Sequence, residues 1–374
     1  MHVLIAGGGV GGLCLAQGLT TAGVGVTVFE RDAAIATREQ GYRIHIDANG
    51  NTALRQCLPP DLFALYLATS NKPGPAVIRV LDQTGRQLTE FAAPGGDDAH
   101  NAVDRLTLRQ VLAHGLGEVL RFGARVTDFV EHEDRVEVRY ADGSVVRGDV
   151  LVAADGINSL VRKRLLPGAE LVDTGLRCVY GRTPLRAITL PERLRYGFTS
   201  ITDRHGRAMV LAAFEPREPL AESPVEPYLM WAVLTDEDWP AEDPQALHRL
   251  ALRHIDGWAP ELRGFVERAD VDACLPIPIR SSVPVPPWPT GRVTLLGDAI
   301  HAMTPAGGVG ANTAMRDAAL LTEQLVAVER GAVPLRPALA EYEARMREYG
   351  FAAVTNSLRS VEMLRPKAKT EAVR

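Results

Sequence analysis

The sequence has few of the residue patterns that build metal centres and redox dithiols. Its four cysteines (Cys14, Cys57, Cys178 and Cys274) lie far apart and form no CxxC pair, and its nine histidines show no HExxH or HxxxH spacing. These absences argue against a zinc site, a redox dithiol or another dedicated metal site. Scattered thiols in a chain of 374 residues fit a reducing compartment.

Long apolar runs and an excess of one charge are also missing. No stretch reaches the roughly 18 to 20 apolar residues that a membrane span needs. The apolar N-terminus lacks a basic segment, and its glycines would break a targeting helix. The 41 basic and 46 acidic side chains give a net charge of −5, with no nucleic-acid footprint. We therefore expect a cytoplasmic protein without stable membrane insertion and without a nucleic-acid partner.

The sequence opens with a βαβ pattern. A strand over residues 2–6 is followed by a glycine cluster, an amphipathic helix over about 10–21 and a second strand over 25–29. This order within about thirty residues is typical of the start of a doubly wound α/β domain. Two later apolar runs, 150–154 and 293–296, indicate strands that are buried on both faces.

The middle of the chain has a different texture. Residues 124–148 alternate around the turn dipeptide Asp142-Gly143, which predicts an antiparallel pair. Between 174 and 274, strand-like runs alternate with turns, and helix signals are weak until about residue 245. This region indicates a mainly antiparallel sheet in a separate layer. The proline-rich stretch 276–291 is typical of a crossing between domains.

We therefore predict an α/β fold with a Rossmann-like domain, a second sheet domain and a C-terminal helix. The Rossmann-like domain, with its parallel sheet, would be discontinuous and take residues 1–72, 101–175 and 275–340. The mainly antiparallel β-sheet domain would take 73–100 and 176–274. Residues 341–374 would form the C-terminal helix and a frayed basic tail.

A GxGxxG motif is present at Gly7, Gly9 and Gly12, with Val10 and Gly11 between the last two. The first glycine allows a tight turn, the second lets a pyrophosphate approach, and the third permits close helix–strand packing. The helix N-terminus then offers free N–H groups and a positive dipole end to phosphate. Glu30, at the end of the second strand, can accept hydrogen bonds from a ribose. A glycine-rich turn without a ligand is the alternative interpretation.

Two further motifs follow buried strands. Asp155-Gly156 comes directly after the strand at 150–154, and Gly297-Asp298 after the strand at 293–296. The segment 303–312, MTPAGGVGAN, then opens another helix. In content, order and spacing these motifs resemble the class A, single-component FAD-dependent aromatic hydroxylases, the p-hydroxybenzoate hydroxylase-like flavoprotein monooxygenases. The resemblance covers nearly the whole chain, and it implies that the first domain binds FAD and the second the substrate.

The resemblance also implies roles for individual residues. Glu30 and Arg31 would hold the adenosine end of FAD, and Asp298 would accept a hydrogen bond from a ribityl hydroxyl. Arg109 would lie near the flavin phosphates and ribityl chain, with Arg105 as the alternative. Five residues would run beneath the flavin ring: Pro305, Gly308, Gly310, Ala311 and Asn312. There a helix N-terminus would stabilise negative charge on the reduced flavin.

Other positions allow two interpretations. Arg43 and His45 would either contact the flavin or be packed polar residues. Asp155 would serve FAD binding and NAD(P)H approach, or cap the next helix. His301 fits a support for the Gly297-Asp298 turn better than a catalytic base. A strand with Met230 and Trp231 would line a pocket or contribute to the core.

The function implied by the resemblance is that of a monooxygenase with no catalytic side chain of its own. NAD(P)H would reduce FAD, and O₂ would form a flavin C4a-hydroperoxide that hydroxylates a small electron-rich substrate, aromatic or polyketide-like. Epoxidation, Baeyer–Villiger insertion or a flavin-dependent reductase would use the same motifs. An NAD-dependent dehydrogenase would not explain Gly297-Asp298, and a halogenase would need a WxWxIP stretch that is missing. A non-enzymatic FAD-binding protein is the alternative of another class.

Overall fold

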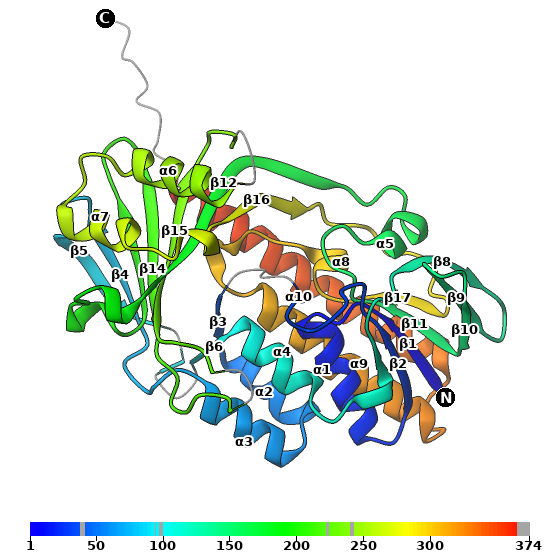
Figure 1. The fold of residues 1–374 in the computed structure, drawn as a ribbon. Coiled ribbons are helices and arrows are strands. Elements are labelled where there is room, and N and C mark those ends of the chain that lie inside the picture. The colour runs from blue at the N-terminus through cyan, green and yellow to red at the C-terminus, as the bar shows by residue number, and fades with distance from the viewer. Residues whose placement is uncertain (38–41, 94, 97–99, 222–223, 240–242, 365–374) are drawn as a thin grey trace, which may run out of the picture.

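The computed structural model describes residues 1–37, 42–93, 95–96, 100–221, 224–239 and 243–364. Within these ranges the chain forms two main sheets that lie on opposite sides of the molecule (Figure 1). One is a five-stranded parallel sheet and the other a seven-stranded, mainly antiparallel sheet. Most of the long helices pack beneath and between them. This arrangement confirms the predicted α/β fold with a second, antiparallel layer.

The parallel sheet has the strand order β17-β11-β1-β2-β7. Its strands are β1 (His2–Ala6), β2 (Gly25–Phe29), β7 (Leu120–Arg121), β11 (Val150–Ala153) and β17 (Val293–Leu295). The residues of β11 and β17 are buried throughout, as their continuous apolar runs predicted. The carboxyl ends of these strands meet at one edge of the sheet, where ligands bind in doubly wound folds.

Helix α1 (Val10–Thr21) begins and ends where the sequence predicted, but the expectation of an amphipathic helix was wrong. Every residue from Val10 to Leu19 is buried. Three glycines allow this burial because a side chain at any of them would collide with a neighbour. A Cβ at Gly11 would lie 2.6 Å from Leu296, and one at Gly18 would lie 2.6 Å from Thr322. Such close packing encloses the helix on all sides.

A small three-stranded sheet packs against one face of the parallel sheet. It has the order β10-β9-β8 and comprises β8 (Val126–Glu131), β9 (Val136–Tyr140) and β10 (Val145–Gly148). The predicted hairpin around Asp142-Gly143 is the β9–β10 pair, and β8 extends it. A Cβ at Gly148 would approach the Leu4 side chain to 2.7 Å, so the two sheets are in direct contact.

The seven-stranded sheet has the order β16-β12-β15-β14-β13-β4-β5. Its strands are β4 (Val77–Asp82), β5 (Gln87–Ala92), β12 (Leu171–Pro184), β13 (Phe198–Thr202), β14 (Ala208–Phe214), β15 (Tyr228–Thr235) and β16 (Leu275–Ser282). Only the β13–β4 pair is parallel among these described strands. The proline-rich stretch expected to cross between domains is half strand: β16 pairs with β12, and the crossing itself follows Ser282.

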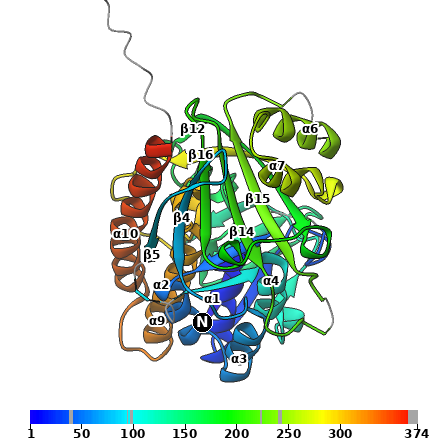
Figure 2. The same cartoon turned by 90° about the vertical axis from the view of Figure 1, so that its left-hand side faces the viewer.

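The two faces of this sheet have different neighbours. Helices α6 (Pro244–His254) and α7 (Pro260–Glu267) cover the outer face (Figure 2). Alternation along β15 buries Trp231 with those helices and turns Met230 toward the other face. The sequence left open whether this strand lines a pocket or contributes to the core. The structure gives a different answer for each residue: Trp231 belongs to the core, and Met230 lines a cavity.

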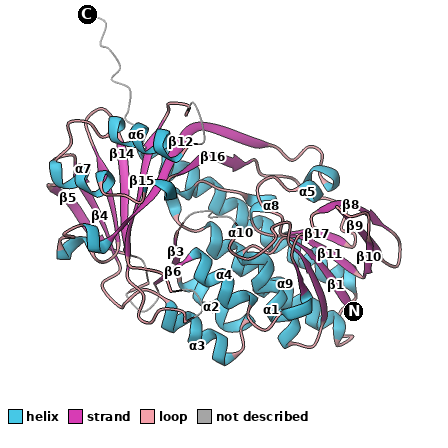
Figure 3. Ribbon diagram, viewed as in Figure 1, coloured by secondary structure: helices cyan, strands magenta, loops and turns pink. Residues whose placement is uncertain are grey.

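The remaining elements connect the two sheets (Figure 3). The ribbon of β3 (Arg43–Ile46) and β6 (Asn101–Asp104) lies between them. The other helices are α2 (Ala48–Cys57), α3 (Pro60–Thr69), α4 (Arg105–Ala113), α5 (Leu160–Leu165), α8 (Asp298–His301), α9 (Gly310–Glu329) and α10 (Leu335–Leu364). Short 3-10 turns occupy Gly117–Val119, Leu185–Ala187, Glu192–Leu194, Val271–Ala273 and Pro305–Gly307. The predicted basic tail at 365–374 lies outside the described residues.

None of the described helices combines the length and the apolar character that a membrane crossing requires. Within the same residues, no cluster of three or more His, Cys, Asp or Glu side chains is placed to hold a metal ion.

Candidate active site

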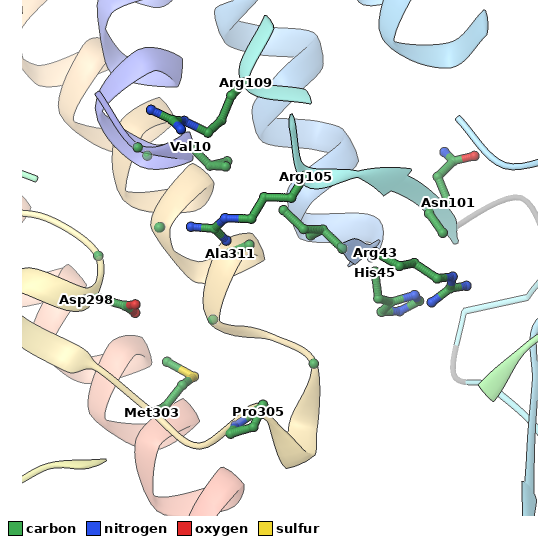
Figure 4. A pocket seen from close by; sticks show the side chains of 18 of the residues that line it. Val10, Arg43, His45, Asn101, Arg105, Arg109, Asp298, Met303, Pro305 and Ala311 are labelled. Carbon is green, nitrogen blue, oxygen red and sulfur yellow. The ribbon is translucent and has the colours of Figure 1, made fainter. Parts of the chain in front are cut away.

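A cavity of about 1170 Å³ lies between the parallel sheet and the antiparallel sheet. It collects residues from β1, β2, β3, β6, β12, β15, α1, α4, α8 and α9, and from the segment that follows β11 (Figure 4). Sixteen of the seventeen predicted cofactor residues line it: Gly7, Gly9, Val10, Gly11, Gly12, Glu30, Arg31, Arg43, His45, Arg109, Asp155, Asp298, Pro305, Gly308, Gly310 and Ala311. Asn312, the other one, is buried beside the cavity and does not line it.

The glycine loop between β1 and α1 has the geometry that its sequence predicted. Gly7 has φ +110°, and a Cβ there would lie 2.3 Å from the carbonyl oxygen of Ala154. A Cβ at Gly12 would lie 2.1 Å from the carbonyl oxygen of Gly7. At Gly9, in contrast, a Cβ would meet nothing within 4 Å. Gly7 and Gly12 are therefore required for packing, and Gly9 keeps the backbone open to the cavity.

The N-terminus of α1 is suited to bind an anion. Its N-cap, Gly9, provides no side-chain hydrogen bond, and the first turn contains no acidic residue. The first N–H groups of a helix have no partner within the helix, and the helix dipole places positive charge there. A phosphate is the ligand that these groups fit best.

Glu30 has more contacts than the sequence indicated. Its Oε2 accepts a hydrogen bond from the Gly8 N–H (2.9 Å), and its Oε1 accepts one from the Asp32 N–H (2.9 Å). An ionised carboxylate has about four acceptor sites, so it can accept a further bond from a ribose. Glu30 thus holds the glycine loop in shape and keeps acceptor capacity at the cavity.

Arg109 and Arg105, one turn apart on α4, are placed differently. Arg109 donates from Nε and Nη2 to the carbonyl of Gly8 (3.3 and 3.1 Å) and from Nη1 to the carbonyl of Ile35 (3.0 Å). It therefore braces the glycine loop. The Arg105 side chain extends into the cavity toward Asp298 (Figure 4), and its buried Nε has no hydrogen-bond partner among the described residues. Burial lowers the pKa of Arg105, while the charge of Asp298 raises it.

Two carboxylates follow strands of the parallel sheet and line the cavity. The carboxylate of Asp155, which follows β11, accepts a hydrogen bond from the Leu160 N–H through Oδ2 (2.9 Å). Its Oδ1 is buried without a partner among the described residues, so this residue both supports α5 and lines the cavity. Asp298, which follows β17, is the first residue of α8. Desolvation raises the pKa of both carboxyls, and His301 and Arg105 oppose the shift at Asp298.

The segment from Pro305 to Gly310 forms the floor of the cavity and ends at the start of α9. Gly308 adopts φ +63°, a conformation that favours glycine. The N-cap of α9, Val309, gives no side-chain hydrogen bond, so the first N–H groups of this helix are also available. Asn312 fixes the segment: its Nδ2 donates to the carbonyls of His45 (2.9 Å) and Gly308 (3.1 Å). Its role is therefore positioning rather than cavity lining.

A buried network lies behind the Gly297-Asp298 turn. The Asp317 Oδ2 accepts hydrogen bonds from the Gly297 N–H (2.8 Å) and from His301 Nε2 (2.6 Å). Its Oδ1 accepts one from the Tyr349 hydroxyl of α10 (2.7 Å). Both His301 and Asp317 are fully buried. His301 therefore supports the turn, as the sequence indicated, and lines no part of the cavity.

Arg43 and His45 project from one face of β3 at the far side of the cavity from Asp298 (Figure 4). Arg43 Nε donates to the carbonyl of Ala213 (3.1 Å). His45 Nε2 and His100 Nδ1 are 3.1 Å apart, and the two rings are stacked. Burial, with the charges of Arg43 and His100, lowers the pKa of His45 to about 3. The imidazole of His45 is therefore neutral near pH 7.

Sequence reasoning missed much of the cavity wall, although it weighed Arg105 as an alternative. The side chains of the antiparallel sheet and its turns that line the cavity were not predicted, apart from Met230; they include Tyr180, Tyr196, Phe198 and Arg217. Their strands were recognisable, but which face of each strand turns inward depends on pairing and on α6 and α7. Aromatic residues in alternating positions were the only available signal.

The described residues fit FAD as the cavity's cofactor. One end supplies an open glycine loop and an uncapped helix for a diphosphate. The carboxylates of Glu30, Asp155 and Asp298 can accept hydrogen bonds from ribose and ribityl hydroxyls. A second uncapped helix, α9, faces the cavity beyond them.

Comparisons with known proteins agree with this fit. A family model described as an FAD binding domain matches residues 100–357. The dual O-methyltransferase/FAD-dependent monooxygenase elcB of Phaeosphaeria nodorum is 33% identical over 370 residues, covering 86% of this chain and 40% of that protein. The chloroplastic zeaxanthin epoxidase of Nicotiana plumbaginifolia is 30% identical over 341 residues, covering 87% of this chain and 48% of that protein. The chain thus spans less than half the length of these relatives.

Solved structures show the same architecture. A putative FAD-containing monooxygenase from Photorhabdus luminescens subsp. laumondii superposes with a TM-score of 0.86 at 34% identity, covering 96% of this chain and 97% of that one. HpxO from Klebsiella pneumoniae, complexed with FAD and uric acid, superposes with a TM-score of 0.80 at 25% identity, covering 98% and 89%. Together with the cavity geometry, these matches show that the chain belongs to the FAD-dependent monooxygenase family, whose cofactor is FAD.

Proposed function

We propose that this protein hydroxylates an electron-rich, aromatic or polyketide-like substrate at the expense of NAD(P)H and O₂. In the balanced reaction, a substrate C–H, O₂, NAD(P)H and a proton give a C–OH, NAD(P)⁺ and water. The observation that carries the proposal is a single cavity joining the dinucleotide-binding loop, Asp298 and the α9 N-terminus to an aromatic wall of the antiparallel sheet. Cofactor groups and a planar substrate can therefore meet in one space.

The residues that would hold FAD are those already described at the parallel sheet. The α1 N-terminus would bind the diphosphate, Glu30 and Arg31 the adenosine, and Asp298 a ribityl hydroxyl. Arg105, rather than Arg109, would supply positive charge to the anionic part of the cofactor, because Arg109 is already engaged with the glycine loop. When bound, FAD supplies electron transfer from NAD(P)H and activation of O₂, so no side-chain nucleophile is needed.

The protein's own contribution is binding, orientation and charge stabilisation. The N–H groups at the start of α9 would stabilise negative charge placed against Gly310 and Ala311. Tyr180, Phe198 and Met230 offer a mostly apolar wall for a planar substrate. In the predicted division of the chain, 1–72, 101–175 and 275–340 would serve the cofactor, and 73–100 and 176–274 the substrate.

An epoxidase is the second candidate function. Chloroplastic zeaxanthin epoxidases are among the relatives, and epoxidation would use the same cavity and cofactor. The mass and connectivity of the product distinguish the two: an aromatic C–OH supports hydroxylation, and an oxirane supports epoxidation. We also propose a cytoplasmic location, supported by four cysteines that are all free and buried.

The test begins with the visible absorption spectrum of the purified protein and identification of the cofactor released on denaturation. We expect FAD, and NADH or NADPH oxidation that phenolic or polyketide-like compounds stimulate, with oxygen from O₂ in the product. A protein that refuses added FAD would contradict the proposal. A protein that binds FAD but oxidises neither nucleotide with any compound would instead be a non-enzymatic flavin-binding protein, and NAD(P)H oxidation without oxygen transfer would indicate a reductase.

A further inference from the structure

Charge is distributed unevenly along the cavity. The carboxylates that line it are Glu30, Asp32, Asp155 and Asp298, and each follows a strand of the parallel sheet. The opposite end, here called the distal end, is lined by β3, β6, α2, residues 71–78, the inner face of the antiparallel sheet and Arg217 after β14. Among the described residues lining the distal end there is no Asp or Glu. Four cations line it: Arg43, Arg55, Lys72 and Arg217.

Arg43 is the most confined of these cations. Apart from the bond from its Nε to the Ala213 carbonyl, it makes no ion pair with a carboxylate in the described parts of the chain. Burial lowers its pKa, and its charge contributes to keeping His45 neutral. A guanidinium desolvated without a counter-charge carries a cost, because burial removes hydration that only an anion replaces fully. An anionic ligand would offset this cost.

The other three cations differ in how they are balanced. Within the described ranges, Arg217 bonds neutral oxygens alone: its Nε donates to the Asn71 carbonyl (3.0 Å), and its Nη2 donates to the Asn101 side chain (3.2 Å). Lys72 is paired with Glu215 (2.5 Å). Arg55 is exposed and lies over the Phe63 ring. Arg43, which is partly buried, and Arg217, which is exposed, have no carboxylate partner among the described residues. Arg86, an exposed arginine that pairs with Asp82 outside the cavity, offers a control.

The rest of the distal end fits an aromatic body. Tyr180, Tyr196 and Phe198 present rings from the antiparallel sheet and its turns to the same space. The stacked imidazoles of His45 and His100, whose Nε2 and Nδ1 lie 3.1 Å apart, add polar groups beside Arg43. An arginine fork next to neutral donors matches the two oxygens of a carboxylate.

We propose that the distal end selects a planar substrate that carries an ionised acidic oxygen, a carboxylate or an acidic enol, with Arg43 as its main contact and Arg217 as its second. The proposal rests on the proposed function, since it concerns the substrate of that same cavity. A phosphate of the nicotinamide nucleotide has related chemistry, and the experiment separates the two sources.

The experiment uses the FAD-loaded protein and measures dissociation constants from the change that ligands cause in the flavin absorption spectrum. The probes are matched acid and amide pairs: naphthoic acid and naphthamide, anthraquinone carboxylic acid and its amide, and indole carboxylic acid and its amide. In at least one pair we expect the acid to bind roughly tenfold or more tightly than the amide. Absence of this preference in every pair, including absence of binding, overturns the proposal.

Variants show which side chains cause the tighter binding of acids than of amides. Arg43→Gln should weaken acid binding by roughly tenfold to a hundredfold and leave amide binding unchanged. Arg217→Gln should have a smaller effect of the same kind, and it keeps the test valid if Arg43→Gln fails to retain FAD. The control Arg86→Gln, outside the cavity, should retain the preference. If Arg43→Gln and Arg217→Gln both retain it, the proposal is wrong.

Two further readouts separate the possible failures. If Arg43→Gln weakens NADH or NADPH binding and spares the acids, the distal end serves the nucleotide and the substrate proposal falls. FAD content and NAD(P)H oxidation are measured on each preparation. Their loss in the unmodified protein would contradict the proposed function, whereas their presence without acid preference would contradict only the inference about substrate charge.

Discussion

Asp298 illustrates how a single side chain can serve a ligand rather than the fold. Its carboxylate faces the cavity, with Arg105 directed toward it (Figure 4). Its backbone, in contrast, is fixed by the turn at Gly297, whose N–H donates to Asp317. Removing the Asp298 carboxylate should therefore affect cofactor binding much more than folding.

We expect Asp298→Ala to weaken FAD binding by roughly tenfold to a hundredfold, the effect of losing a hydrogen bond to a charged acceptor, about 1.5 to 3 kcal/mol. Fluorescence titration of the apoprotein with FAD measures the change. Asp134→Ala, at an exposed turn where the carboxylate pairs with Arg135, is the matched control. Equal affinities for the two variants would show that Asp298 does not contact the cofactor.

At the scale of helices and strands, buried polar contacts hold together the helices next to the carboxyl end of β17. Asp317 of α9 joins the Gly297 turn, His301 of α8 and Tyr349 of α10. A Cβ at Gly350 would lie 2.6 Å from the His301 ring, so α10 can approach only because this position is glycine. Burial alone would lower the pKa of His301, but the charge of Asp317 and the hydrogen bond to it raise the pKa above its ordinary value.

This raised pKa predicts a pH dependence of stability. Protonated His301 favours the folded state, so its contribution is complete below about pH 6.5, the unfolded value, and is lost as pH rises through the folded pKa. The difference in Tm between the natural protein and His301→Gln should therefore be largest below pH 6.5 and shrink at higher pH. Asp317, Asp298 and Tyr349 are the titratable groups that act on this ring or its hydrogen-bond partner.

Thermal unfolding monitored by circular dichroism from pH 5 to pH 9 measures this difference. His114→Gln, which changes an exposed imidazole, is the matched control. A His301→Gln difference that stays constant or grows with pH would mean that His301 is neutral in the folded protein, and that the network depends on hydrogen bonding without charge.

Elements determined by local rules were predictable from the sequence. The bounds of β1, α1 and β2 follow from apolar runs and from the glycines between them, and the structure matches them. The full burial of α1 was not predictable, because it results from α9 and from Thr322, far along the chain. The same holds for Arg105 and Arg109: their spacing places both on one side of α4, and only tertiary contacts decide that Arg109 bonds the glycine loop while Arg105 extends into the cavity.

Within the site, the same distinction between local sequence and tertiary packing separates what could be predicted from what could not. The glycine motif identifies a phosphate-binding loop because its chemistry is almost entirely backbone. The distal end depends on which face of each antiparallel strand turns inward, and strand pairing with the packing of α6 and α7 decides that. Asn312 shows a further difference: its position in the motif was recognised, but its amide fixes His45 and Gly308 rather than lining the cavity.

At the scale of the whole molecule, the cavity lies between the two large sheets, and both contribute to its walls. The lining includes members of two separate hydrophobic cores, such as Val10 of one and Met230 of the other. FAD should therefore stabilise the whole chain, and its removal should lower Tm without removing the fold, because the strands and helices around the site have extensive buried cores of their own.

Ligand linkage gives the expected size of this effect. At a free FAD concentration one hundred times Kd, the folded state gains about 2.7 kcal/mol. With an unfolding entropy of roughly 2.1 cal/mol/K per residue, this corresponds to a Tm increase of roughly 3 to 4 °C for this chain. Calorimetry of the apoprotein with increasing FAD tests it: each further tenfold in FAD should add about 1.4 kcal/mol, and Asp298→Ala should need more FAD for the same shift. A Tm that does not respond to FAD at these concentrations would mean that the folded protein does not bind FAD.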